Sequence, residues 1–168
     1  KKVVGDPKKL QPKILEWLKT QQEPFVPVWN EWQGQGANAV IGTSNVTSAC
    51  RARDDTTELS ATLHVPGGDW KGGLLIGFED NENYTVALLN SGGGFSVNQR
   101  VNKGWNVLKR GNALAAQDGE YHLKAVRDGD KITFTVNETE IGSFELKGKK
   151  LGVCLENCTL RFTEIKWK

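Results

Sequence analysis

The amino-acid sequence predicts an all-β domain, a sandwich or barrel of short strands, preceded by one short helix. Apolar and polar residues alternate through much of the chain, as in 59–65 and 132–136. This period of two is typical of strands with one solvent-facing side. Clusters of Gly, Asn, Asp and Pro separate these runs at short intervals and supply the turns. About twelve short, closely spaced strands favour a sandwich or barrel.

Length and charge narrow the class of protein. The chain has 168 residues, which is enough for one domain with a hydrophobic core. No apolar run approaches the roughly 20 residues of a membrane-spanning helix. The chain has 22 Lys and Arg residues against 20 Asp and Glu residues. A protein that binds nucleic acid through its phosphates usually has a larger excess of basic residues. We therefore expect neither a membrane nor a nucleic acid as a partner.

The N-terminal segment differs from the rest of the chain. Asp6-Pro7 is a helix-start signal, and apolar residues then recur at helical spacing over 10–18. We predict a helical lead-in over 1–24, either packed on the domain or linking it to a neighbour, and a β-sandwich over 25–168. Because the chain begins with Lys and contains no Met, we expect a domain or processed product of a longer protein.

The remaining elements are expected to be strands. The 74–76 run is apolar on both sides, which predicts a strand covered on both faces. Near the C-terminus Leu160 and Phe162 share one phase of alternation and Ile165 takes the other, so a β-bulge is predicted near Thr163-Glu164. In chain order the strand-like runs are 39–41, 46–52, 59–65, 74–76, 84–89, 95–101, 105–110, 121–127, 132–136, 140–146, 150–155 and 159–167.

Three stretches together carry a resemblance to a known superfamily. They are Gly72–Tyr84, Tyr121–Asn137 and Leu151–Leu155, followed by a closing strand through Phe162 and Ile165. Their order resembles the concanavalin A-like lectin/glucanase superfamily, which includes laminin-G-like domains. The likeness is closest to the fructan-type carbohydrate-binding modules of bacterial levanases. The resemblance implies a two-sheet antiparallel jelly roll that binds glycans at a concave face or a loop rim.

Candidate ligand-binding residues follow from the chemistry of sugars. The apolar face of a sugar ring stacks on exposed aromatic rings, and amides, carboxylates and Arg bind the hydroxyls. Trp70 is the first candidate because glycines flank it in a polar loop, although it could also fold back onto the sandwich edge. Trp105 follows a turn and is the second, with a strand-start core Trp as the alternative. The polar candidates are Asp69, Asp80, Asn83 and Arg100.

An acidic turn over Glu79–Asn83 is open to two interpretations. Its dense oxygen ligands could hold calcium, which prefers about six to eight oxygens. The run lacks the spacing of a known calcium loop, so the alternative is a solvated turn that contacts a ligand. Apart from this possible calcium ion, no cofactor is expected.

Catalytic and metal motifs are absent from the sequence. Glucanases of this fold share a Glu-x-Asp-x-x-Glu strand that supplies the two carboxylates of glycoside hydrolysis, and no such string occurs. His64 and His122 are the only histidines, and each lies on the polar phase of a strand. No Cys motif accompanies them, so the sequence argues against a Cys/His nucleophile or a zinc site.

Three cysteines leave the disulfide state open. Cys50 lies in an early strand, and Cys154 and Cys158 flank a short turn. The superfamily topology implies that Cys50 lies near Cys154 or Cys158, with a disulfide possible in an exported protein; three buried thiols are the alternative. Four Asn-x-Ser/Thr sequons lean toward secretion, with chance as the alternative.

These observations lead to one functional hypothesis and two alternatives. We expect a non-catalytic glycan-binding module of a larger, exported protein, extracellular or periplasmic, whose partners are carbohydrate and neighbouring domains. The first alternative is a structural or protein-interaction domain of the same fold without a sugar site. The second is a glycoside hydrolase, which requires two carboxylates about 5–9 Å apart in a cleft.

Overall fold

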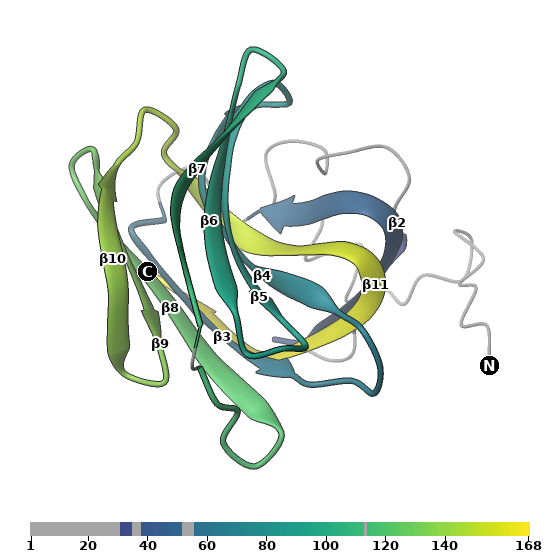
Figure 1. Ribbon diagram of the computed structural model, residues 1–168. Helices are drawn as coiled ribbons and strands as arrows, with labels where there is room; N and C mark the ends of the chain where they lie inside the picture. The colour runs from purple at the N-terminus through teal and green to yellow at the C-terminus, as the bar shows by residue number, and fades with distance from the viewer. Residues whose placement is uncertain (1–30, 35–37, 52–55, 113) are drawn as a thin grey trace.

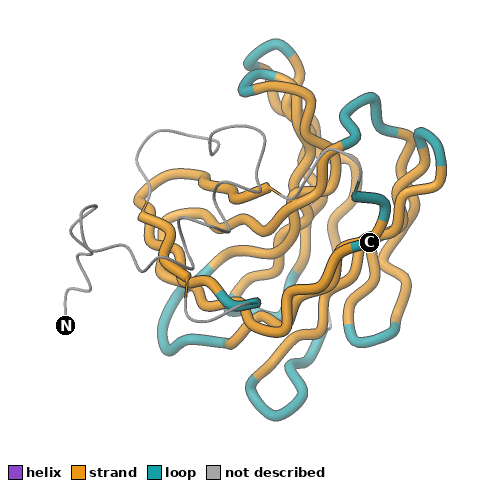
Figure 2. The backbone as a smooth tube through the Cα atoms, turned by 180° about the vertical axis from the view of Figure 1, so that it is seen from behind, coloured by secondary structure: helices purple, strands orange, loops and turns teal. Residues whose placement is uncertain are grey.

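The computed structural model describes residues 31–34, 38–51, 56–112 and 114–168, and all regular elements in these ranges are β-strands (Figures 1 and 2). The all-β prediction is therefore confirmed. The predicted N-terminal helix and its boundary with the sandwich lie outside the described residues. Within those residues, no helix has the length and apolar character needed to cross a membrane.

Every strand pairing in the fold is antiparallel. Hydrogen bonds join the strands in the order β10-β9-β8-β3-β11-β4-β5-β6-β7, with β2 beside β11 and β1 beside β2. The strands are β1 (Glu31–Gly34), β2 (Val40–Arg51), β3 (Glu58–His64), β4 (Lys71–Asp80), β5 (Asn83–Asn90), β6 (Phe95–Val101), β7 (Gly104–Gly111), β8 (Glu120–Asp128), β9 (Lys131–Val136), β10 (Thr139–Glu145) and β11 (Lys150–Trp167).

Strand β11 divides this continuous sheet into two layers. Its first part, Lys150–Leu155, pairs with β4, and its last part, Arg161–Trp167, pairs with β3. The sheet therefore curls into one layer of β4 to β7 and a second layer of β3, β8, β9 and β10, with β11 and β2 common to both (Figure 1). The result is the predicted sandwich of jelly-roll type.

Two irregularities allow β11 to bend between the layers. Its register with β2 shifts between Glu156 and Cys158, and Asn157 has a φ of 52°. Its register with β3 shifts between Thr163 and Lys166, and Glu164 has a φ of 50°. Such bulges bend a strand and reverse the phase of its side chains. The bulge predicted near Thr163-Glu164 is confirmed.

Apolar residues form two clusters rather than one. The main core lies between the layers and includes Leu74, Ile76, Phe134 and Phe162. The second cluster lies on the other face of the β4–β5 pair, so the 74–76 run is buried on both sides as predicted. Its members are Ala49, Leu75, Phe78, Tyr84, Val86, Leu88 and Cys154.

A lysine closes one side of the sandwich. Strand β7 is the edge of one layer and β10 is the edge of the other. The Lys109 ammonium on β7 donates a hydrogen bond to the backbone carbonyl of Ile141 on β10. The two free edges are therefore tied together by one long side chain, whose apolar stem spans the gap.

Close packing between β4 and β5 leaves no room for a side chain at Gly73 and provides a test of the fold. A Cβ at Gly73 would overlap the carbonyl oxygen of Ala87 on β5, which cannot move without breaking the sheet. We predict that Gly73→Ala lowers the free energy of unfolding by about 1–3 kcal/mol, the usual cost of overpacking. Urea denaturation monitored by Trp fluorescence measures this change.

The matched control for that variant is Gly67→Ala. Gly67 is exposed in the turn before β4, and a Cβ there meets nothing within 4 Å. Its urea midpoint should stay within error of the original protein. Equal midpoints for both variants would contradict the tight approach of β4 and β5.

Candidate functional site

The face of the β4–β7 layer that points away from the main core carries the candidate site; we call it the open face. Cross-strand partners in an antiparallel sheet point to the same side, so the register defines the rows of side chains on this face. Two adjacent rows run across all four strands. One consists of Leu75, Val86, Asn98 and Val107, and the other of Phe78, Tyr84, Arg100 and Trp105.

Trp105 is the most prominent aromatic side chain of the open face. It lies at the start of β7 and is 46% exposed. Its ring meets the Tyr84 ring edge-on, at 5.6 Å between centroids and 89° between planes, and the Arg100 guanidinium lies 5.4 Å from its centroid. These two contacts orient the indole and leave much of it accessible. The interpretation of Trp105 as a core residue is wrong.

A hollow of 310 Å³ lies beside Trp105 on this face; we call it the open-face hollow. Val86 from the second apolar cluster forms part of its floor. Asn98 lines it from β6, where its amide donates to the Ser96 hydroxyl at 2.9 Å and keeps its carbonyl oxygen for another partner. The full lining is Thr47, Val86, Asn98, Trp105 and Glu156.

Glu156 reaches the open-face hollow from the bend of β11. The Thr47 hydroxyl donates to its Oε2 at 3.4 Å, and the Lys71 ammonium donates to its Oε1 at 3.2 Å. The ion pair is about a third exposed, so it adds little stability. The ion pair instead holds the Glu156 carboxylate in place, and the remaining lone pairs of that carboxylate can accept hydrogen bonds from a ligand.

A second hollow, of 500 Å³, lies at the end of the sandwich. The ends of β4, β5 and β6 and the loop between β10 and β11 line it. Arg100 lines this end hollow and also contacts Trp105, so it connects the two hollows. The lining residues are Gly77, Glu79, Asn83, Tyr84, Thr85, Gln99, Arg100, Val101, Asn102, Glu145, Leu146, Lys147 and Gly148.

The acidic turn between β4 and β5 is organised by Asp80. Its Oδ1 accepts from the Glu82 amide at 2.8 Å and from the Asn83 side chain at 2.9 Å. Asn83 in turn accepts from the Asn102 amide at 3.2 Å, which ties this hairpin to the β6–β7 turn. The Asn83 and Glu82 hydrogen bonds stabilise the ionised carboxylate and lower the pKa of Asp80. No contact here tests whether this turn holds calcium or is the solvated turn of the alternative interpretation.

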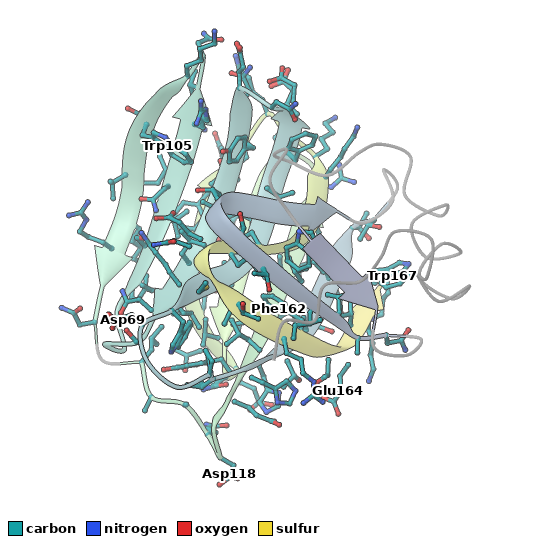
Figure 3. All side chains as sticks on the ribbon, turned by 90° about the vertical axis from the view of Figure 1, so that its right-hand side faces the viewer. Asp69, Trp105, Asp118, Phe162, Glu164 and Trp167 are labelled. Carbon is teal, nitrogen blue, oxygen red and sulfur yellow. The ribbon has the colours of Figure 1, made fainter. Side chains whose placement is uncertain are left out.

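The structure brings half of the candidate ligand-binding residues together. Trp105, Arg100 and Asn83 lie around the two hollows, and Asp80 positions Asn83. Asp69 lies at the opposite end of the layer from Trp105, where its Oδ1 accepts from the Ser91 hydroxyl at 3.3 Å (Figure 3).

The interpretation of Trp70 as an exposed stacking platform is wrong. Trp70 is only 5% exposed and belongs to the main core, where its ring lies 6.0 Å from that of Tyr121. The glycines that flank it let the loop turn back, so that the large indole fills the gap between the layers instead of facing solvent. The alternative interpretation, a loop side chain folded back onto the sandwich, is confirmed.

Sequence reasoning missed three of the lining residues. Asn98 could have been found, because alternation along β6 puts it on the same face as Arg100. Thr47 and Glu156 could not have been found, because only the pairing of β2 with β11 brings them to the hollow. They are direct cross-strand partners beside the register shift at Asn157. That register is a long-range property of the fold.

Cys154 belongs to the second apolar cluster under the open face, whereas Cys158 packs against the main core, and neither lines the open-face hollow. Neither Cys154 nor Cys158 forms a disulfide with a described side chain. Burial raises the pKa of both, and most strongly that of the fully buried Cys154. The backbone of Cys50 pairs with Val153, next to Cys154, but the Cys50 side chain lies outside the described residues, so the disulfide stays a prediction.

Comparison with known proteins identifies the fold. No protein-family model and no curated protein sequence matches the chain. A solved structure of the carbohydrate-binding module CBM66 from Bacillus subtilis aligns with a TM-score of 0.67 at 14% identity, covering 86% of this chain and 94% of that one. The fold is a concanavalin A-like jelly roll. The resemblance proposed from the sequence is confirmed at the level of fold.

Other structures share this jelly roll. The galectin LEC-6 of Caenorhabditis elegans aligns with a TM-score of 0.51 at 17% identity, covering 87% of this chain and 91% of that one. A xylan β-1,4-xylosidase from Bacillus halodurans C-125 aligns with a TM-score of 0.60 at 12% identity, over 83% of this chain and 34% of the xylosidase. The jelly roll thus occurs both as a separate domain and as part of a longer enzyme.

The hydrogen bonds of Asp80 predict a measurable titration. We expect NMR titration of its carboxyl carbon to give a pKa below the ordinary value for Asp, and Asn83→Ala to move it back toward that value, because the Asn83 amide is the main cause of the shift. A lowered folded-state pKa contributes stability above the ordinary pKa, and this contribution is lost as pH falls through the folded pKa. Asn81→Ala, in the same exposed turn, is the control and should leave the titration unchanged. An unshifted Asp80 in the original protein would refute the geometry of this turn.

Proposed function

We propose that this domain binds carbohydrate at the open-face hollow without catalysing a reaction. One sugar ring stacks on the exposed face of Trp105, and its hydroxyls bond to Asn98, Glu156 and Thr47. The observation that carries the proposal is the half-exposed Trp105, oriented by Tyr84 and Arg100 beside a hollow lined by an amide, a hydroxyl and a carboxylate.

The arrangement suits the mixed chemistry of a sugar. A pyranose or furanose has an apolar face that prefers an aromatic ring and an edge of hydroxyls that donate and accept hydrogen bonds. Trp105 and Val86 supply the apolar surfaces, and Asn98 and Glu156 supply the polar partners. Because their neighbours already hold these side chains, little conformational freedom is lost on binding.

The comparisons agree with this proposal. Two of the similar structures carry names of sugar-binding proteins, a carbohydrate-binding module and a galectin. The fold alone does not specify a ligand, so the proposal depends on the side chains of the hollow. We further propose that the domain belongs to a larger exported protein, extracellular or periplasmic, with carbohydrate and neighbouring domains as its partners.

The first test is glycan binding by the Trp105→Ala variant. A glycan array that includes fructans and xylans, followed by calorimetry with the best binder, should give a Kd in the millimolar range or tighter. Loss of the stacking surface should weaken this affinity about tenfold or more.

The control for that test is Asp69→Ala, at the far end of the layer, which should bind as the original protein does. If no glycan binds, the proposed function is wrong. If a glycan binds equally well to the Trp105→Ala variant, its site lies elsewhere on the domain.

The second test addresses the polar side of the hollow. Asn98→Ala removes an amide that can bond to a sugar hydroxyl, and we predict about three- to tenfold weaker binding in calorimetry. Asn106→Ala is the matched control, because Asn106 pairs with Gln99 and so lies on the other face of the sheet. If both variants lose the same amount of glycan affinity, the open-face hollow is not the binding site.

A second candidate function is protein binding through β7. All exposed large apolar side chains of the described residues lie at this edge: Val101, Trp105, Val107 and Leu108. Exposed apolar patches of this kind mark interaction surfaces. This candidate predicts that no glycan on the array binds, and that Val107→Ser weakens binding to a neighbouring domain of the same parent chain.

A further inference from the structure

Arg100 differs from two other cations near the open face because it has no carboxylate partner. The Lys71 ammonium lies 3.2 Å from Oε1 of Glu156, and the Lys103 ammonium lies 3.4 Å from Oε1 of Glu82. No carboxylate of the described residues forms an ion pair with Arg100. The charge of its guanidinium is therefore left for a ligand to neutralise.

The Nε–H group of Arg100 also lacks a hydrogen-bond acceptor. This atom is shielded from solvent and has no partner among the described residues. A buried donor without a partner is unfavourable, because it has lost its hydrogen bonds to water and gained none in return. Such a group calls for an explanation, and a ligand that supplies the acceptor is one.

Aromatic rings hold the guanidinium in position. It lies 5.4 Å from the centroid of the Trp105 ring, and a planar guanidinium packs well on such a surface. Tyr84 lies beside it: burial raises the pKa of the Tyr84 hydroxyl, and the positive charge of Arg100 opposes this rise. These rings orient the guanidinium but carry no negative charge to neutralise it.

The end hollow gives a ligand access to this guanidinium. Its volume of 500 Å³ is within the usual range of about 300–1,000 Å³ for small-molecule sites. Lys147, an exposed residue of the loop between β10 and β11, lines the same hollow and supplies a second cation.

Two carboxylates also line the end hollow, those of Glu79 and Glu145. Both residues are exposed, so water screens their charge. Arg100 is only partly exposed and lies against aromatic rings, where its charge is screened less. An anion that reaches the guanidinium is therefore attracted by Arg100 more strongly than either glutamate repels it.

We propose that the end hollow binds the carboxylate of an acidic sugar residue, with Arg100 as its main contact; this inference rests on the proposed function. The guanidinium presents Nε–H and an Nη–H side by side, and this fork matches the two oxygens of a carboxylate. Because Arg100 connects the two hollows, a neighbouring sugar of the same chain can stack on Trp105. The expected ligand is an oligosaccharide that contains uronic acid.

Matched pairs of neutral and acidic oligosaccharides test the inference. They are xylotriose without and with one glucuronic acid, galactotriose and galacturonic acid trimer, and cellotriose and its form oxidised to carboxylates at C6. In at least one pair, calorimetry should give about tenfold tighter binding of the acidic member, and added salt should weaken that member more than the neutral one.

The ratio of the two affinities measures the role of Arg100. Arg100→Gln should bring the ratio close to one, whereas Arg100→Lys keeps the charge, loses the fork and should give an intermediate value. The ratio is the readout because a change in the orientation of Trp105 weakens both members alike. Arg161→Ala is the control, since Arg161 is exposed on β11 and lines neither hollow, and it should leave the ratio unchanged.

Two exposed residues of the end hollow provide independent variants. Glu79→Gln removes a like charge and should strengthen binding of the acidic member about two- to threefold. A loss of affinity in this variant would instead assign Glu79 to the hydroxyls of a neutral sugar and overturn the inference. Lys147→Ala should weaken the acidic member about two- to threefold, and it tests the inference even if the Arg100 variants do not fold.

The outcomes separate this inference from the proposed function. If a neutral glycan binds at Trp105 and no acidic member binds more tightly than its neutral counterpart, the inference is wrong and the proposed function stands. A preference for the acidic member that survives Arg100→Gln also overturns the inference. If no glycan binds, both are wrong.

Discussion

The structure depends on the pairing of β11 with strands of both layers. One continuous strand hydrogen-bonds to β4, β3 and β2, so the two layers cannot separate without breaking it. A straight strand could not follow this path, and two bulges supply the bends. The side chains of β11 change face at both irregularities, because Leu155 and Leu160 both point into the main core on either side of Asn157, and Phe162 and Ile165 do so on either side of Glu164.

The candidate site lies next to one of these bulges. The shift beside Asn157 follows Glu156, which reaches the open-face hollow, and the shift at Glu164 puts a carboxylate next to Thr62. The floor of the open-face hollow is well packed, because the second apolar cluster lies directly beneath it. Polar side chains that project from a packed floor hold their positions better than those on a loop.

The sequence predicted the parts of the fold that depend on local pattern. Alternation located most of the strands, the doubly apolar 74–76 run predicted burial on both faces, and the change of phase before Ile165 predicted the bulge. It wrongly divided two long strands, because the predicted runs 39–41 and 46–52 both belong to β2 and the runs 150–155 and 159–167 both belong to β11. Trp70 was mispredicted because composition cannot tell an indole in a glycine-rich loop from one that turns inward. Glu156 was missed because its position depends on cross-strand neighbours, and register is set by the whole sheet.

The tie between Lys109 and the Ile141 carbonyl has a mechanical consequence. Trp105 lies on an edge strand, which has a neighbour on one side only, so a tethered ligand that pulls on it would peel β7 from β6 one hydrogen bond at a time. Lys109 anchors the same strand to β10 in the other layer and so shares that load between two sheets. The cation also discourages another chain from pairing with the free edge, where charged side chains commonly protect strands from aggregation. One lysine thus both reinforces the strand that carries Trp105 and guards its exposed edge.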